Sequence, residues 1–150
     1  MKNFRMKVIS STPGKDPFEE EFLRWVNNFF THQHPRYVPT ERVWVPPTDV
    51  YETRESIHIC MELAGVREED VEIKLINQYL VVRGKRDDDS RVTKENYYLM
   101  EIQYGVFQRV FQLPVPCNPQ DITAKLKNGF LNITIKKPQS DSHEYRIQIQ

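Results

Sequence analysis

Apolar and polar residues alternate with a period of two on both sides of the dipeptide Asn128-Gly129. Asparagine and glycine supply the two positive-φ positions of a type I′ turn, and such a turn between alternating segments is a strong β-hairpin signal. The apolar side chains of the flanking segments fall on one face: Ile122, Ala124, Leu126, Leu131, Ile133 and Ile135. Residues 122–137 therefore predict a hairpin whose register is fixed by its buried face.

Further short segments of strand character precede this hairpin, and turn-forming residues separate them. They cover residues 49–53, 56–63, 71–75, 79–86, 97–102 and 105–114. No strand–helix–strand alternation is visible between them. Short strands at this spacing predict an all-β fold, an antiparallel immunoglobulin-like β-sandwich.

A charged segment, residues 87–96, interrupts the strands and carries Val92 as its only apolar residue. Loops of this length inside a compact domain are usually functional or disordered. It leads directly into Tyr97, Tyr98, Leu99 and Met100. A small strand carried on a long loop is suited to leaving its own sheet and pairing with the edge of a neighbour's sheet. These four residues are therefore candidates for a dimer interface.

Residues 1–42 lie outside the β pattern and are rich in phenylalanine. Asp16, Pro17 and Glu19 provide the N-cap, the first-turn proline and the acidic residue of a helix start. Large apolar residues then recur at helical spacing: Phe18, Phe22, Trp25, Val26 and Phe29, with Phe30 next to them. The helix either packs on its own domain or forms an arm that contacts other subunits or client proteins. Large aromatic surface outside a core favours the arm.

Arg109 breaks the alternation of its strand, because it shares a face with Phe107, Phe111 and Leu113. A buried arginine needs a carboxylate or carbonyl partner, since an unpaired buried charge costs several kcal/mol. Arg109 either reaches solvent at a strand end or is satisfied at an interface. The planar guanidinium suits an interface better than a lysine would, so we expect the second.

Charge and composition exclude several function classes. Lysine plus arginine equals aspartate plus glutamate, so the net charge of +0 gives no support for binding nucleic acid or an anionic membrane. The same neutrality does not oppose self-association. No apolar run approaches the ~20 residues that span a bilayer. The two cysteines match no metal-binding spacing, which fits a reducing cytoplasm.

Candidate catalytic and metal-binding groups are few. His32 and His34 form an H-x-H pair, but no further ligand lies nearby in the sequence, so we expect no metal. His58 and Cys60 stand side by side on a strand with no third orienting group, so Cys60 is expected to be an inert thiol. Phosphate-binding loops, dinucleotide motifs and catalytic triads are also missing from the sequence. We therefore expect neither an enzyme nor a cofactor.

Four segments occur in an order that resembles the small heat-shock proteins. They are D-V-Y-E-T at 49–53, E-L-A-G-V at 62–66, G-V-F-Q-R-V-F-Q-L-P at 105–114 and A-K-L-K-N-G-F-L at 124–131. A terminal I-x-I motif, Ile147 and Ile149, accompanies them. The resemblance implies an N-terminal arm (residues 1–42), an α-crystallin domain (43–137) and a C-terminal extension (138–150). The long loop is similar to that of the bacterial, archaeal and plant type, in which its strand swaps between monomers.

This resemblance implies an ATP-independent holdase chaperone of the stress response. Such proteins form dimers that assemble into larger oligomers, bind unfolding proteins before they aggregate, and pass them to ATP-dependent chaperones. The alternative is a monomeric interaction module of the CS-domain co-chaperone class, against which the I-x-I motif and the long loop argue.

The resemblance also assigns roles to residues. Ile147 and Ile149 match an anchor that docks in a neighbouring subunit's groove, and Gln148 replaces the proline often found between them. The groove is lined by Val71, Ile73, Leu75, Ala124 and Leu126. Arg109 matches an arginine that supports subunit contacts. The client-binding arm carries Phe4, Phe18, Phe22, Trp25, Phe29 and Phe30.

Overall fold

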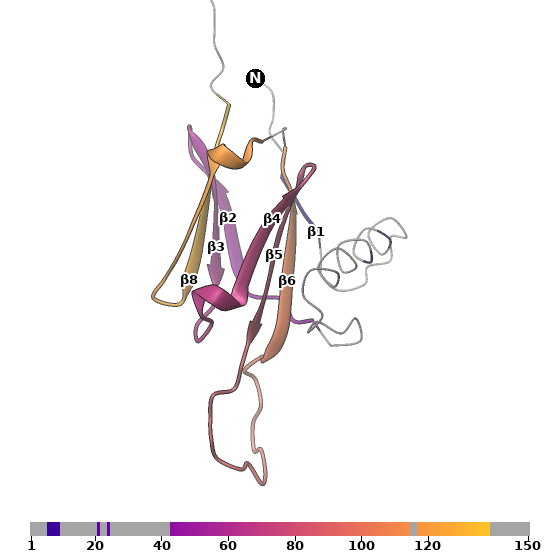
Figure 1. The fold of residues 1–150 in the computed structure, drawn as a ribbon, viewed down its shortest axis with the longest axis vertical. Coiled ribbons are helices and arrows are strands. Elements are labelled where there is room, and N and C mark those ends of the chain that lie inside the picture. The colour runs from indigo at the N-terminus through magenta and orange to yellow at the C-terminus, as the bar shows by residue number, and fades with distance from the viewer. Residues whose placement is uncertain (1–5, 10–20, 22–23, 25–42, 115–116, 139–150) are drawn as a thin grey trace, which may run out of the picture.

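The strands of the protein form two four-stranded antiparallel sheets (Figure 1). In the computed structural model the described residues are 6–9, 21, 24, 43–114 and 117–138. One sheet has the order β1-β6-β5-β4 and the other has the order β2-β3-β8-β7. The elements are β1 (Lys7–Ile9), β2 (Thr48–Glu52), β3 (Ser56–Glu62), η1 (Glu68–Asp70), β4 (Val71–Ile76), β5 (Tyr79–Arg86), β6 (Gly105–Gln112), η2 (Pro119–Asp121), β7 (Ile122–Lys127) and β8 (Phe130–Lys136).

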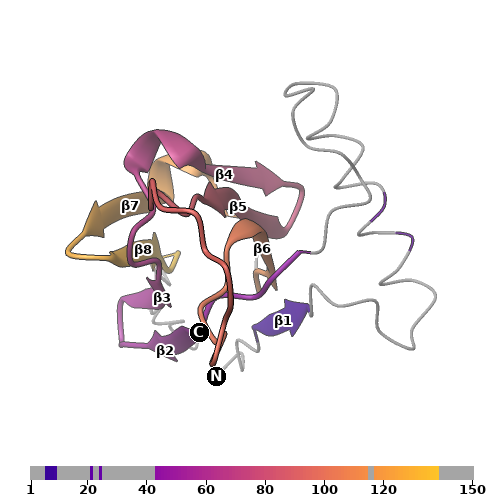
Figure 2. The same ribbon diagram turned by 90° about the horizontal axis from the view of Figure 1, so that it is seen from below.

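The two sheets face each other as the layers of a sandwich, with β4 and β7 at one side and β1 and β2 at the other (Figure 2). The predicted all-β sandwich is therefore confirmed. Alternation along β3 and β8 places every second side chain between the layers, and cross-strand pairs such as Ile59–Ile133 and Met61–Leu131 are buried. Burying a large apolar side chain contributes about 1.5–3 kcal/mol, so these pairs supply much of the core.

The hairpin predicted at Asn128-Gly129 is present and joins β7 to β8. Both turn residues have positive φ, 52° at Asn128 and 79° at Gly129, as a type I′ turn requires. The N–H of Leu63 donates a hydrogen bond of 2.6 Å to the carbonyl of Gly129. The hairpin tip is thereby fixed to the connection that follows β3.

The β5–β6 pair is buried on both of its faces. The inner face contributes Phe107 and Phe111 to the core. On the opposite face Val81 and Val110 stand opposite each other and are also buried, although an alternating strand usually has one exposed face. This part of the sheet is therefore buried on its outer face as well as on the face between the two layers.

The strand predicted at residues 97–102 is wrong for the single chain. This segment has no regular structure and its residues are exposed. The reason is that β5 and β6 pair directly with each other up to Arg86 and Gly105, so the loop between them finds no free strand at its base. The predicted N-terminal helix start and the terminal I-x-I motif lie outside the described residues.

Candidate functional site

Residues 87–104 form a long irregular loop that extends beyond the end of the sandwich (Figure 1). Its large apolar side chains are exposed to solvent: Tyr97 55%, Tyr98 103%, Leu99 73%, Met100 69% and Ile102 62%. Four of the five residues predicted for a dimer interface therefore lie together on one exposed segment, and the fifth, Arg109, lies apart from them on β6. A contiguous apolar segment of this kind marks an interaction site.

Polar groups of the same loop contact one another. The ammonium group of Lys94 forms an ion pair with the carboxylate of Asp88, and the N–H of Ser90 donates a hydrogen bond of 3.1 Å to the same carboxylate. Lys85 and Asp87 form a further ion pair of 2.9 Å at the loop base. These contacts hold part of the loop in shape, while the apolar segment after it keeps its surface exposed.

β2 is an edge strand and, among the described strands, pairs with β3 alone. An edge strand has a row of backbone N–H and C=O groups that another chain's strand can pair with. Tyr51 on this strand is 54% exposed, and its ring stacks on that of His58 at 5.0 Å between centroids. One chain thus contains both an unpaired edge and an exposed apolar segment that could add to such an edge.

The five residues predicted to line the anchor groove lie on the edge strands β4 and β7, which border the same side of the sandwich (Figure 2). All five point toward the interior, because their cross-strand neighbours are core residues or Gly84. Four of them are only half-buried, and Ala124 is exposed: Val71, Ile73, Leu75, Ala124 and Leu126. This side of the sandwich therefore offers apolar surface that its own chain leaves partly uncovered.

Arg109 lies on the inner face of β6 and is half-buried. Its Nη1 donates a hydrogen bond of 3.3 Å to the carbonyl of Pro46, and its guanidinium lies 5.7 Å from the ring centroid of Phe111. Its Nε is buried and has no hydrogen-bond partner among the described residues. Burial lowers the pKa of Arg109, since a low-dielectric environment disfavours the charged form. Within the single chain the guanidinium is incompletely satisfied, so an interface role stays a prediction.

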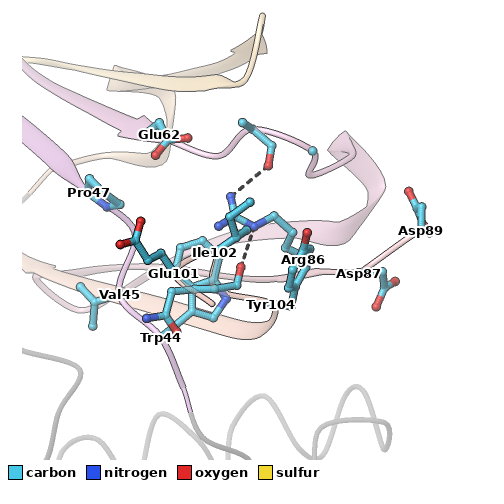
Figure 3. Close-up of a pocket in the computed structure, with 13 residues that line it drawn as sticks. Trp44, Val45, Pro47, Glu62, Arg86, Asp87, Asp89, Glu101, Ile102 and Tyr104 are labelled. Carbon is cyan, nitrogen blue, oxygen red and sulfur yellow. Dashed lines mark hydrogen bonds between the residues drawn. The ribbon is translucent and has the colours of Figure 1, made fainter. Parts of the chain in front are cut away.

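A further cluster surrounds Arg86 at the loop base (Figure 3). Its guanidinium carbon lies 4.2 Å from the ring centroid of Trp44, within range of a cation–π contact. Trp44 is itself buried and contacts Phe107 edge-on at 5.4 Å between centroids. A cavity of about 740 Å³ opens beside them. Sequence analysis missed both residues, and the one available signal was a tryptophan in an otherwise proline-rich segment.

The cysteines do not assemble a reactive site. Cys60 and Cys117 are free and half-buried, and burial raises the pKa of the Cys117 thiol. His58 lies 3.4 Å from the hydroxyl of Thr134 and stacks on Tyr51. The described part of the chain contains no group of three or more His, Cys, Asp or Glu side chains that could hold a metal ion. None of its helices is long and apolar enough to cross a membrane.

The antiparallel sandwich, the long loop and the edge strands define an α-crystallin-type fold. The family model "Hsp20/alpha crystallin family" matches residues 49–150. The chain is 34% identical over 145 residues to small heat shock protein C2 of Rickettsia felis, covering 96% of this chain and 93% of that one. It is 33% identical over 147 residues to spore protein SP21 of Stigmatella aurantiaca, covering 93% and 86%. The protein belongs to the Hsp20/α-crystallin family of small heat-shock proteins.

Solved structures give the same result. A small heat-shock protein from Xylella fastidiosa superimposes with a TM-score of 0.60 at 30% identity, covering 73% of this chain and 99% of that one. Heat shock protein 16.0 from Schizosaccharomyces pombe superimposes with a TM-score of 0.58 at 27% identity, covering 71% and 99%. The predicted family is therefore confirmed, and membership supports a role as a chaperone in a family that is generally non-enzymatic.

Proposed function

We propose that the protein is an ATP-independent holdase that binds unfolding proteins, prevents their aggregation and passes them to ATP-dependent chaperones. It works as a homo-oligomer built from dimers, in the cytoplasm. The observation that carries the proposal is the combination, in one chain, of an exposed apolar segment at residues 97–102 and an unpaired edge at β2. Each needs a partner, and a second copy of the chain supplies both.

The dimer forms by reciprocal exchange of this loop. Tyr97 to Met100 of one chain add to the β2 edge of its partner, and the partner returns the same contact, so the interface is isologous. Each large side chain buried there contributes about 1.5–3 kcal/mol. Ordering the backbone costs about 1–2 kcal/mol per residue, and the ion pairs in the loop reduce this cost because they hold part of it in shape beforehand.

Larger assemblies form through the C-terminal extension. Ile147 and Ile149 of one dimer dock on the side of another where β4 and β7 leave Val71, Ile73 and Leu75 half-buried. The burial of two isoleucine side chains is opposed by the cost of ordering the backbone that carries them, so the contact is weak and exchanges. Many such contacts in a closed assembly bind by avidity. This suits a reservoir that must release subunits under stress.

Client proteins bind the aromatic residues of the N-terminal arm. The sequence of the arm is rich in large apolar residues: Phe4, Phe18, Phe22, Trp25, Phe29 and Phe30. Unfolding proteins expose apolar side chains, and such surface buries against them without sequence specificity. Binding of this kind needs no nucleotide, which agrees with a sequence that contains no phosphate-binding loop.

The proposal is tested by heating an unrelated aggregation-prone protein alone, with this protein in stoichiometric excess, and with the same excess plus ATP. We expect light scattering to fall strongly in both mixtures and to the same extent. Scattering that is unchanged by the excess, or suppressed only when ATP is present, would contradict the proposal.

A further inference from the structure

Arg86 is the last residue of β5, and its side chain folds back beneath the long loop rather than into solvent (Figure 3). Its Nε donates a hydrogen bond of 2.8 Å to the carbonyl of Gln103, on the returning limb of the loop. Its Nη1 donates a second, of 3.0 Å, to the carbonyl of Ala64, on the connection after β3. One guanidinium thus bridges the loop and the body of the sandwich.

The platform for this guanidinium is Trp44, which is fixed to the start of β6. The ring N–H of Trp44 donates a hydrogen bond of 3.0 Å to the carbonyl of Gly105, and its backbone N–H donates one of 3.0 Å to Val106. The connection on the other side is equally fixed, because Leu63 beside Ala64 bonds to the hairpin tip. Arg86 therefore ties the loop that is exchanged in the proposed dimer to two points of the sandwich, Ala64 and Trp44.

The chemistry of this cluster requires an arginine. Two nitrogens of the planar guanidinium donate to carbonyls, and the guanidinium carbon lies over an indole ring. A lysine ammonium is a point charge on a flexible stem and cannot satisfy this planar geometry. Carboxylates also border the cavity, from Glu62, Asp87, Asp89 and Glu101. A lysine ammonium at position 86 that does not reach both carbonyls would be attracted to these carboxylates instead. The loop would then leave the domain in a different direction.

We propose that Arg86 is a positioning residue for dimerisation. It sets the direction in which residues 87–104 leave the domain, and so holds the apolar segment in place to pair with β2 of a partner. The inference rests on the proposed exchange of this loop. When the bridge is lost, the free loop samples more directions. Dimerisation must then order the loop more, so the dimer is less stable.

The test compares full-length wild type with Arg86→Lys, Arg86→Ala and Lys85→Ala. The last is the matched control, because it removes a neighbouring cation that pairs with Asp87 in the same loop and leaves the Arg86 bridge in place. Isotope-labelled and unlabelled copies of each variant are mixed, and subunit exchange is followed by native mass spectrometry. The thermal midpoint of each variant is measured in parallel.

We expect both Arg86 variants to exchange subunits about tenfold faster than wild type. Lys85→Ala loses one ion pair of the loop but keeps the bridge, so it should exchange only slightly faster than wild type and clearly more slowly than either Arg86 variant. The inference is overturned if Arg86→Lys exchanges at the wild-type rate, or if exchange rises only in proportion to a lowered thermal midpoint. Arg86→Lys retains charge and stem, so it decides the question if Arg86→Ala does not fold.

The oligomeric state of wild type shows separately whether the proposed loop exchange itself is wrong. If wild type itself is monomeric at every concentration, the proposed loop exchange is wrong. Hydrogen exchange at the amides of residues 101–104 then tests the bridge in the monomer. Faster exchange there in Arg86→Lys than in Lys85→Ala would support the positioning role, and equal rates would overturn it.

Discussion

Two strand pairs of this protein, β7–β8 and β5–β6, have similar alternating sequence patterns but connections of very different length. Asn128-Gly129 closes the first pair with two residues, and β7 pairs with β8 along its whole length. The second pair is joined by residues 87–104, which expose a contiguous apolar segment. The two connections differ in what they leave outside the pairing. A tight turn leaves no apolar segment over, whereas the long loop carries one that stays exposed in the single chain, and we propose that a second chain covers it.

The largest effect is expected from deleting residues 91–102, which makes the second connection resemble the first. The apolar segment is then lost, while the β5–β6 pairing from Tyr79 to Gln112 is retained. We expect the dimer to disappear and the sandwich to stay folded, as measured by sedimentation velocity and circular dichroism. A dimer that persists would show that a different interface holds it.

A smaller effect is expected at the opposite side of the sandwich. Replacing both isoleucines of the extension (Ile147→Gly and Ile149→Gly) removes about 3–6 kcal/mol of burial per anchor from the proposed contact with β4 and β7. The mass of the assembly should fall toward that of a dimer, and dimerisation itself should be unchanged. The matched control is Gln148→Gly, which changes the same segment without removing apolar surface. If the double variant has the particle mass of wild type, Ile147 and Ile149 do not anchor the assembly.

The smallest effect is expected within the hairpin. At Gly129, φ is 79° and an added Cβ would lie 3.1 Å from Ala64 Cα, so Gly129→Ala combines backbone strain with crowding. At Gly105, φ is 89° and an added Cβ would meet nothing within 4 Å, so Gly105→Ala adds backbone strain alone. Strain of this kind costs about 1–3 kcal/mol. Urea unfolding should show that Gly129→Ala destabilises the domain more than Gly105→Ala, and the reverse order would contradict the account.

Most strands were predictable from the sequence because their signal is local. Period-two alternation and turn residues gave β3, β4, β5, β7 and β8 within one or two residues. The β1–β6 pairing was not predictable, since it joins residues 7–9 to residues 110–112 through a contact distant in sequence. The segment at 97–102 has strand composition but no strand beside it in the single chain, so composition alone gave the wrong local structure.

The candidate site was predictable only in part. Tyr97, Tyr98, Leu99 and Met100 could be selected because apolar residues after a charged loop are conspicuous. The bridge at Arg86 could not, because it depends on carbonyls that the fold brings close to it in space. The surroundings of Arg109 were likewise not predictable, since its guanidinium donates a hydrogen bond to the carbonyl of Pro46, 63 residues away in the sequence.

The central claim is that the exposed segment of one chain pairs with β2 of another. Two full-length variants test it directly, both with Cys60→Ser and Cys117→Ser. One carries Tyr51→Cys on the β2 edge and the other carries a cysteine at one of positions 97–100, so that a disulfide between the two can form only between chains. We expect mixing and mild oxidation to yield a cross-linked mixed dimer for at least one loop position. No mixed cross-link at any of the four positions would contradict it.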